Sequence, residues 1–295
     1  MNRRTFLTQT SLLGAAALLP ISSSVPAQHR KLGYQLFSVR EDMAKDPLAT
    51  LKALIKMGYQ DFEVYGYEAE KNTIYGYTSA EFRKVLEDLN VTTTSGHFMF
   101  HPLLDKTDDE LKRFVDQCIT GATTMGMPYI TWPWMAPEQR TLETFQRLPE
   151  KLNRIGEQIN AAGLGFAYHN HDFEFIDYDG QTGYDIILRE TDPALVKLQL
   201  DLYWVMHSSK LTPKELIQNA PGRYVMWHIK DMHKVSRDYT ELGNGSIDYR
   251  EVLPDPQVSG LEYYYLEQGG NFAHNPLQSA ADSAAYFKAH LQGVF

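Results

Sequence analysis

Short apolar runs alternate with amphipathic segments from residue 32 of the chain to its end. The apolar runs have the length of buried strands, and the segments between them repeat their apolar residues at helical spacing. The pattern predicts strands at residues 32–39, 60–65, 91–98, 129–132, 165–169, 196–201, 224–229 and 263–267. Each predicted strand is followed by a predicted helix, so the chain reads as a series of strand–helix units.

Helix-start signals mark several of these units. Asp46 precedes Pro47, which combines an N-cap with a proline in the first turn, and Gly58 ends the same helix. Capping-box spacing occurs at residues 78–81 and again at 107–110. These signals support the helices that the apolar spacing predicts.

Eight strand–helix units in a chain of this length are typical of a (β/α)8 TIM barrel, whose usual size is about 250 residues. A doubly wound sheet is the alternative. It typically has a glycine-rich phosphate turn after its first strand, and residues 35–40 contain no glycine. We therefore expect a single α/β domain, a TIM barrel, over residues 28–295. In its fourth helix, Pro149 predicts a kink or a later start.

The first 27 residues have the features of an export signal rather than of a barrel strand. Arg3 and Arg4 precede a short apolar run, 12–19, and the small residues Val25 and Ala27 place signal cleavage after Ala27. The run is too short for a stable transmembrane helix, and the paired arginines resemble a twin-arginine signal. We expect a periplasmic protein without a membrane attachment. An ordinary Sec signal or an uncleaved anchor is the alternative.

Charge and cysteine content exclude several classes of protein. The 295 residues include 28 Lys and Arg against 37 Asp and Glu, a net charge of −9. Such a chain lacks the basic surface that binds nucleic acid, and anionic lipid would repel it. The single cysteine, Cys118, excludes an internal disulfide and a cysteine-rich zinc site, and its place on an apolar helix stripe predicts a buried thiol.

Polar residues gather at the predicted C-terminal ends of the strands, where a TIM barrel keeps its chemistry. They are Glu63, His97, His169, His171, Glu174, Asp201, His228, Lys230 and Glu267. Acids that converge on one pocket repel each other and are costly to bury. A divalent cation is the simplest way to neutralise them, and mixed carboxylate and imidazole ligands suit Mn²⁺, Mg²⁺, Co²⁺ or Zn²⁺. A polar pocket that binds no metal is the alternative.

Six segments of the chain also form a familiar series. They are 58–63 (GYQDFE), 169–175 (HNHDFEF), 200–204 (LDLYW), 228–231 (HIKD), 243–249 (GNGSIDY) and 266–268 (LEQ). In this order they resemble the motifs of the xylose-isomerase-like barrel superfamily of sugar phosphate isomerases and epimerases, and most closely its inosose dehydratase branch. The resemblance extends over nearly all of residues 31–290.

The resemblance implies a metal site made by four residues: Glu174, Asp201, His228 and Glu267. One position departs from the pattern of the family. In epimerase relatives the first glutamate lies within the fifth strand, where this chain has His169. His169 or His171 is therefore an alternative to Glu174 as the first metal ligand.

The resemblance also implies proton transfer next to the carbonyl group of a sugar. A cation bound to a hydroxyl and the neighbouring carbonyl oxygen acidifies the C–H bond between them, and a carboxylate removes that proton. Glu174 and Glu267 are the expected proton-transfer pair, and His169 or His171 would protonate a departing oxygen. We expect isomerisation or epimerisation. A lyase that eliminates from an inosose or a 3-keto-glycoside, and a non-catalytic sugar-binding barrel, are the alternatives.

Further residues are expected to contact the substrate. Glu63, His97 and Lys230 would bind its oxygens, and Trp204 would pack on a sugar face; a salt bridge from Lys230 to Asp231 or Glu63 is the alternative. No glycine-rich anion loop or Arg/Lys cluster lies near the last two predicted strands. Together with export, this favours a non-phosphorylated sugar or cyclitol. A homo-oligomer is compatible with the sequence, which does not decide the oligomeric state.

Overall fold

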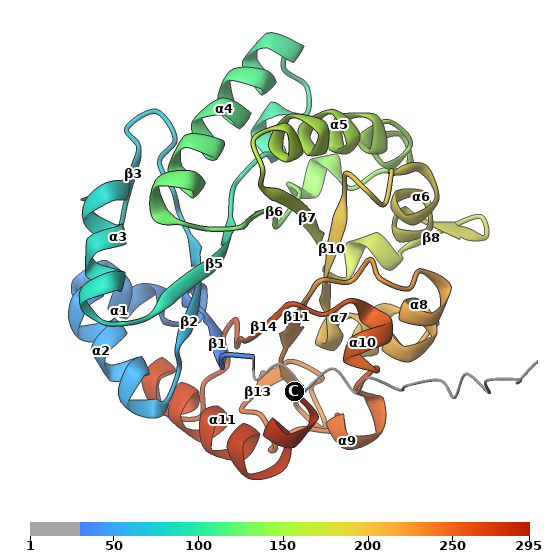
Figure 1. Cartoon of the computed structure of the whole chain (residues 1–295). Helices are drawn as coiled ribbons and strands as arrows, with labels where there is room; N and C mark the ends of the chain where they lie inside the picture. The colour runs from blue at the N-terminus through green and yellow to red at the C-terminus, as the bar shows by residue number, and fades with distance from the viewer. Residues whose placement is uncertain (1–29) are drawn as a thin grey trace, which may run out of the picture.

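The computed structural model describes residues 30–295, and its centre is a closed barrel of parallel strands (Figure 1). Around the ring the strands follow chain order, and the last strand pairs with the first to close it. The barrel strands are β1 (Gly33–Gln35), β2 (Asp61–Tyr65), β5 (Thr92–His97), β6 (Tyr129–Trp132), β7 (Gly165–His169), β10 (Lys197–Asp201), β11 (Met226–Ile229) and β14 (Tyr263–Leu266). The predicted (β/α)8 architecture is confirmed. The predicted export signal, with its cleavage after Ala27, lies outside the described residues.

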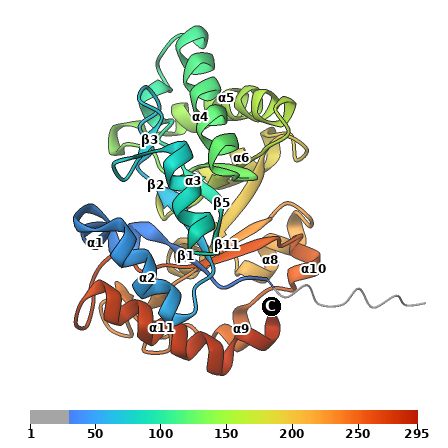
Figure 2. The same ribbon diagram turned by 60° about the vertical axis from the view of Figure 1, so that its left-hand side comes forward.

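Helices surround the barrel and cover its outer face (Figures 1 and 2). They are α1 (Arg40–Lys45), α2 (Pro47–Met57), α3 (Ser79–Asp88), α4 (Asp108–Met125), α5 (Leu142–Ala161), α6 (Gly183–Glu190), α7 (Leu202–Ser208), α8 (Pro213–Asn219), α9 (Tyr249–Val252), α10 (Pro256–Ser259) and α11 (Pro276–His290). Because helices cover the strands from outside and side chains fill the inside, most strand residues are buried, as expected for a parallel sheet.

Short antiparallel hairpins that the sequence pattern does not predict lie in three loops. They pair β3 (Thr73–Ile74) with β4 (Tyr77–Thr78), β8 (Asp177–Tyr178) with β9 (Gln181–Thr182), and β12 (Asp231–Met232) with β13 (Tyr239–Thr240). Each is only two residues per strand, below the length at which alternation of apolar residues gives a signal.

Side-chain caps fix the helix starts that the sequence predicts. Asp46 accepts a hydrogen bond from the backbone N–H of Ala49 at 2.9 Å before α2, and Gly58 ends that helix with a φ of 100°. Thr78 and Thr107 form the two predicted capping boxes. These contacts fix the first turns of α2, α3 and α4.

Two predicted boundaries differ from the structure by more than two residues. The first barrel strand ends at Gln35 because the side chain of Gln35 accepts from the N–H of Phe37 at 3.0 Å and turns the chain into the 3-10 helix η1 (Leu36–Val39). The predicted later start of the fourth large helix is wrong, because α5 begins at Leu142 and contains Pro149. Burial of the apolar face of α5 offsets the hydrogen bond that Pro149 cannot donate.

The thiol of Cys118 is fully buried on α4, as predicted. Among residues 30–295, we find no helix with both the length and the apolar character that a bilayer crossing requires.

Candidate active site

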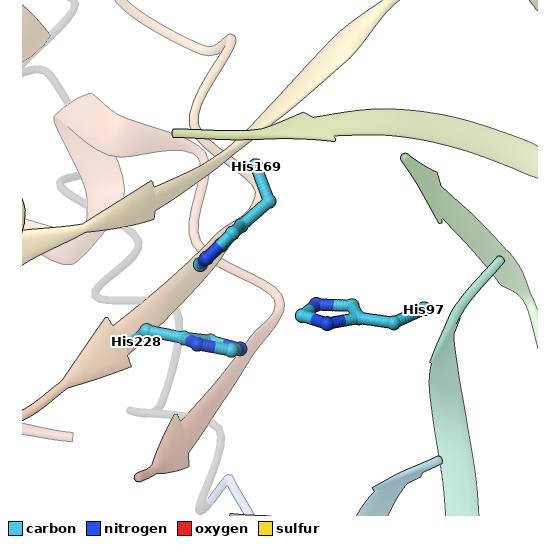
Figure 3. Close-up of side chains that lie close together, drawn as sticks. All are labelled: His97, His169 and His228. Carbon is cyan, nitrogen blue, oxygen red and sulfur yellow. The ribbon is translucent and has the colours of Figure 1, made fainter. Parts of the chain in front are cut away.

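Polar side chains from six barrel strands meet at the C-terminal end of the barrel. They are Glu63 on β2, His97 on β5, His169 on β7, Asp201 on β10, His228 on β11 and Glu267 directly after β14. Figure 3 shows the rings of His97, His169 and His228 pointing toward one another from separate strands. Parallel strands bring their C-terminal ends to one rim, so residues far apart in the sequence lie together here.

The carboxylate of Glu63 contacts four side chains at the base of this group. Its carboxylate accepts hydrogen bonds from the amides of Gln35 and Gln199, both at 2.6 Å. Its Oε2 also lies 2.5 Å from Nε2 of His228 and 3.1 Å from Nε2 of His97. Burial raises the pKa of Glu63, but the two histidines outweigh burial and hold that pKa well below its ordinary value. Glu63 is therefore a fixed negative charge.

His228 bridges two carboxylates. Its Nε2 lies against Glu63, and its Nδ1 lies 2.6 Å from Oε2 of Glu267. Carboxylates only accept, so both ring nitrogens carry protons and the ring is an imidazolium. Burial lowers the pKa of His228, but the charges of Glu63 and Glu267 outweigh burial and raise that pKa to about 9.

Lys230 follows His228 by two residues and neutralises two carboxylates of the site. Its Nζ lies 2.6 Å from Oδ2 of Asp201 and 2.8 Å from Oε2 of Glu267. Burial lowers the pKa of Lys230, but the two carboxylates outweigh burial and raise it, so the ammonium stays charged. The alternative partners, Asp231 and Glu63, are not used. Asp231 instead accepts backbone N–H groups of the loop that contains Gly243.

The central donors fit a divalent cation. Asp201, His228 and Glu267 each offer a ligand atom, and these atoms lie within 4.8 Å of one another. His97, His169 and His228 form a second such group. Buried Nδ1 of His169 has no hydrogen-bond partner, which leaves a ring nitrogen available to a ligand. Two carboxylates with imidazoles are ligands that Mn²⁺, Mg²⁺, Co²⁺ and Zn²⁺ accept.

The structure does not bring Glu174 into this group. Glu174 lies in the 3-10 helix η4 (Phe173–Phe175), where its carboxyl accepts from the hydroxyl of Tyr168 and the N–H of His171, both at 2.8 Å. The loop after β7 thus holds the carboxyl of Glu174 away from the central group. His169, the alternative ligand, lies at the centre, with Nε2 3.8 Å from Oδ2 of Asp201.

Glu174 should make stability depend on pH. Burial raises its pKa to about 8, so the folded protein keeps its proton up to that pH, whereas the unfolded chain loses it near pH 4.5. Its stabilising contribution is complete below about pH 4.5 and is lost as pH rises toward 8, by up to about 1.4 kcal/mol per pH unit. We expect Glu174→Gln to remove this slope from urea unfolding curves.

The control for that measurement is Glu157→Gln, which changes an exposed glutamate of α5. It should leave the pH slope of the wild type unchanged. A Glu174→Gln protein with the same slope as the wild type would contradict the burial argument. Retention of metal binding by Glu174→Gln would agree with the position of Glu174 outside the central group.

A cleft of about 650 Å³ opens above these residues. Its lining includes these predicted site residues: His97, His169, His171, Trp204, Lys230 and Glu267. Glu63 does not line it. The predicted substrate contact by Glu63 is therefore replaced by a supporting role, since its carboxylate is fully buried under His97 and His228.

Two glutamines that the sequence motifs do not include are the partners of Glu63. Gln35 and Gln199 hold it, and Gln199 also accepts from His97, at 2.8 Å. A signal was present, because Gln199 lies two residues before Asp201 and must point to the same face of its strand. A buried amide in a predicted barrel strand needs a polar partner.

Known proteins share this barrel. The inosose dehydratase of Bacillus licheniformis is 27% identical over 278 residues, which cover 83% of this chain and 88% of that protein. A solved sugar phosphate isomerase/epimerase from Parabacteroides distasonis has a TM-score of 0.76 and 24% identity, over 90% of this chain and all of that one. A xylose isomerase-like TIM barrel protein from Mycobacterium smegmatis, solved with magnesium, has a TM-score of 0.65 and 15% identity, over 90% and 97%. A family model for the xylose isomerase-like TIM barrel matches residues 31–288, and the chain belongs to this family.

Proposed function

We propose that this protein is a divalent-metal-dependent isomerase or epimerase of a non-phosphorylated sugar or cyclitol. The observation that carries the proposal is the position of Glu267. Its carboxylate contacts both His228 and Lys230 at the centre, and the residue also lines the cleft. A substrate in the cleft therefore lies against a carboxylate that belongs to the candidate metal site.

The cation would be held by Asp201, His228 and Glu267, with His169 as the fourth ligand. When bound, it supplies positive charge that stabilises the oxygen on which negative charge develops as the neighbouring C–H bond breaks. His228 must give up a proton to serve as a ligand, so metal binding should release protons below about pH 9.

Proton transfer is assigned to Glu267 and His171. Burial raises the pKa of Glu267, but Lys230 and His228 outweigh burial and lower it, so the carboxylate is ionised and able to accept a proton. Burial, followed by the charge of Lys230, lowers the pKa of His171 well below its ordinary value. His171 is thus a neutral imidazole in the cleft, whereas Glu174 does not line the cleft. We therefore replace Glu174 by His171 in the proton-transfer pair.

A neutral substrate agrees with the charges of the cleft. Among the described lining residues, the Lys and Arg side chains are Lys230 and Arg140. Lys230 is neutralised by two carboxylates, and the Arg140 guanidinium stacks on Phe173 with 4.1 Å to the ring centroid. The charge of Lys230 is therefore already balanced within the site, which favours a neutral substrate. Export to the periplasm remains our proposal from the sequence, and fractionation of cells that express the full chain tests it.

A dehydratase is the second candidate. The inosose dehydratase relative covers most of the chain, and His171 could protonate a departing hydroxyl. An elimination begins with the same proton abstraction, so the residues assigned above serve both reactions. The two differ in the product, because only elimination releases water.

Incubation in D2O tests the proposal. The metal-loaded protein is mixed with neutral ketoses, inososes and 3-keto-glycosides, and NMR and mass spectra record deuterium at carbon. Deuterium at carbon without loss of water supports isomerisation or epimerisation, and loss of water supports the dehydratase. Binding without any exchange would overturn both and identify a sugar-binding barrel.

A further inference from the structure

The phenol of Tyr239 lies in the cleft next to the central group. Tyr239 lines the cleft together with Lys230 and Glu267, and Nζ of Lys230 lies 5.9 Å from the centroid of its ring. The same Nζ contacts the carboxylates of Asp201 and Glu267, at 2.6 Å and 2.8 Å. The ring is therefore close to the residues assigned above to the cation and to proton transfer. Tyr239 lies in the short strand β13, outside the sequence motifs.

Backbone and ring contacts fix the position of Tyr239. Its backbone pairs with that of Met232 in the β12–β13 hairpin, and the side-chain amide of Asn271 donates to its carbonyl at 2.8 Å. The rings of Tyr203 and Trp204 pack against it, with 5.0 Å and 5.9 Å between ring centroids. A side chain that is held in place loses little freedom when a ligand binds, which favours affinity.

Gly269 leaves the space that the edge of this ring occupies. A Cβ atom at position 269 would lie 2.9 Å from Cε2, 3.0 Å from Cζ and 3.3 Å from the hydroxyl oxygen of Tyr239. The first of these distances is too short for a Cβ contact, so a larger residue at 269 would push the ring out of its position. Because Gly269 also lines the cleft, the hydroxyl lies beside a cleft residue.

The hydroxyl of Tyr239 is free to bind a ligand. Within residues 30–295 it makes no hydrogen bond, and its oxygen is not enclosed by protein. Burial raises the pKa of Tyr239 above its ordinary value and outweighs the opposing charge of Lys230, so the phenol keeps its proton. Lys230 is already paired with two carboxylates. Tyr239 therefore offers the cleft an uncharged O–H donor, which suits an oxygen of a neutral sugar.

We propose that Tyr239 is a substrate-binding residue that donates a hydrogen bond to a hydroxyl oxygen of the neutral sugar. The inference rests on the proposed function, because the sugar must lie against Glu267 for the phenol to reach it. The cation would bind the carbonyl oxygen and a neighbouring hydroxyl, so Tyr239 contacts a different hydroxyl and contributes to the choice of substrate. A contact that is equal in the bound substrate and in the transition state changes affinity and leaves turnover unchanged.

Two variants test the inference, one through the chemistry of the hydroxyl and one through its position. Tyr239→Phe removes the donor and keeps the ring, whereas Gly269→Ala keeps the donor and displaces the ring. The metal-loaded proteins are compared on the ketoses, inososes and 3-keto-glycosides. For a sugar that exchanges deuterium, KM and the rate at saturation are measured; for one that binds without exchange, calorimetry gives Kd. Each variant should raise KM or Kd roughly 3- to 10-fold, the factor that one uncharged hydrogen bond contributes, at an unchanged rate at saturation.

Monodeoxy analogues of the same sugar identify the hydroxyl that Tyr239 contacts. One analogue should bind the wild type more weakly than the parent sugar does, by that same factor. Tyr239→Phe should bind this analogue and the parent sugar equally, because the contact is already absent. A change of structure alone would not produce this loss of discrimination at a single position of the sugar.

Two controls match the two variants. Tyr203→Phe removes a hydroxyl that donates to the carbonyl of Arg237 at 2.8 Å, on a ring that packs against Tyr239 but does not line the cleft. Gly270→Ala adds a methyl group next to position 269, where no atom lies within 4 Å. Neither control should change KM or Kd.

Wild-type KM or Kd in Tyr239→Phe, or an equal preference of wild type and Tyr239→Phe for the parent sugar over every deoxy analogue, would overturn the inference and leave isotope exchange intact. A fall of more than about tenfold in the rate at saturation would also overturn it, because Tyr239 would then act in the transition state. If none of these sugars bound to the wild type, the inference and the proposed function would fail together.

Discussion

Glu267→Gln should lower turnover roughly 10³-fold, the range that loss of a general base produces. The amide cannot accept the substrate proton, and it removes the negative charge that Lys230 and His228 now share. The change is nearly isosteric, so the barrel should still form. The readouts are the rate of deuterium exchange and the metal content of the purified protein, which should fall together, because one side chain is assigned to both roles.

Glu262→Gln is the matched control for this variant. Glu262 lies directly before β14, as Glu267 lies directly after it, and its carboxylate accepts from the hydroxyl of Tyr129 at 2.9 Å at the opposite end of the barrel. The control should retain exchange and metal. If Glu267→Gln kept more than about a tenth of the wild-type exchange rate, the assignment of Glu267 as the proton acceptor would be wrong.

The sequence predicts the fold well because the barrel repeats one simple pattern. Each predicted strand is a short buried run with a helix after it, and the capped helix starts at Asp46, Thr78 and Thr107 fix the period of the units. The rim residues Asp201, His228 and Glu267 are found together because parallel strands end at a common edge. Strand order alone determines that juxtaposition.

The sequence predicts loop residues less well because a loop can turn its side chains in any direction. Glu174 lies five residues after His169, and only the structure shows that the turn after β7 takes its carboxyl to Tyr168 instead of to the centre. Partners within the site are equally hidden. Neither strand parity nor motif spacing predicts that Lys230 pairs with Asp201 on the adjacent strand and not with Asp231, its neighbour in the sequence.

The pairing of Lys230 leads to the other large expected effect. Lys230→Met removes a buried ammonium and leaves the carboxylates of Asp201 and Glu267 close together without it. Removal of one partner from a buried ion pair typically costs about 3–5 kcal/mol. In the presence of EDTA, we expect the variant to unfold roughly 10 °C below the wild type.

Divalent cations should reverse that loss. A cation and the ammonium of Lys230 both neutralise Asp201 and Glu267, so Lys230→Met should bind Mn²⁺ or Zn²⁺ more tightly than the wild type. Saturating Mn²⁺ should therefore raise the melting temperature of the variant by more than that of the wild type. Lys234→Met, at an exposed lysine of the β12–β13 hairpin, is the control and should change neither quantity. If Lys230→Met were as stable as the wild type in EDTA and bound Mn²⁺ no more tightly, Lys230 would not be the charge that balances these two carboxylates.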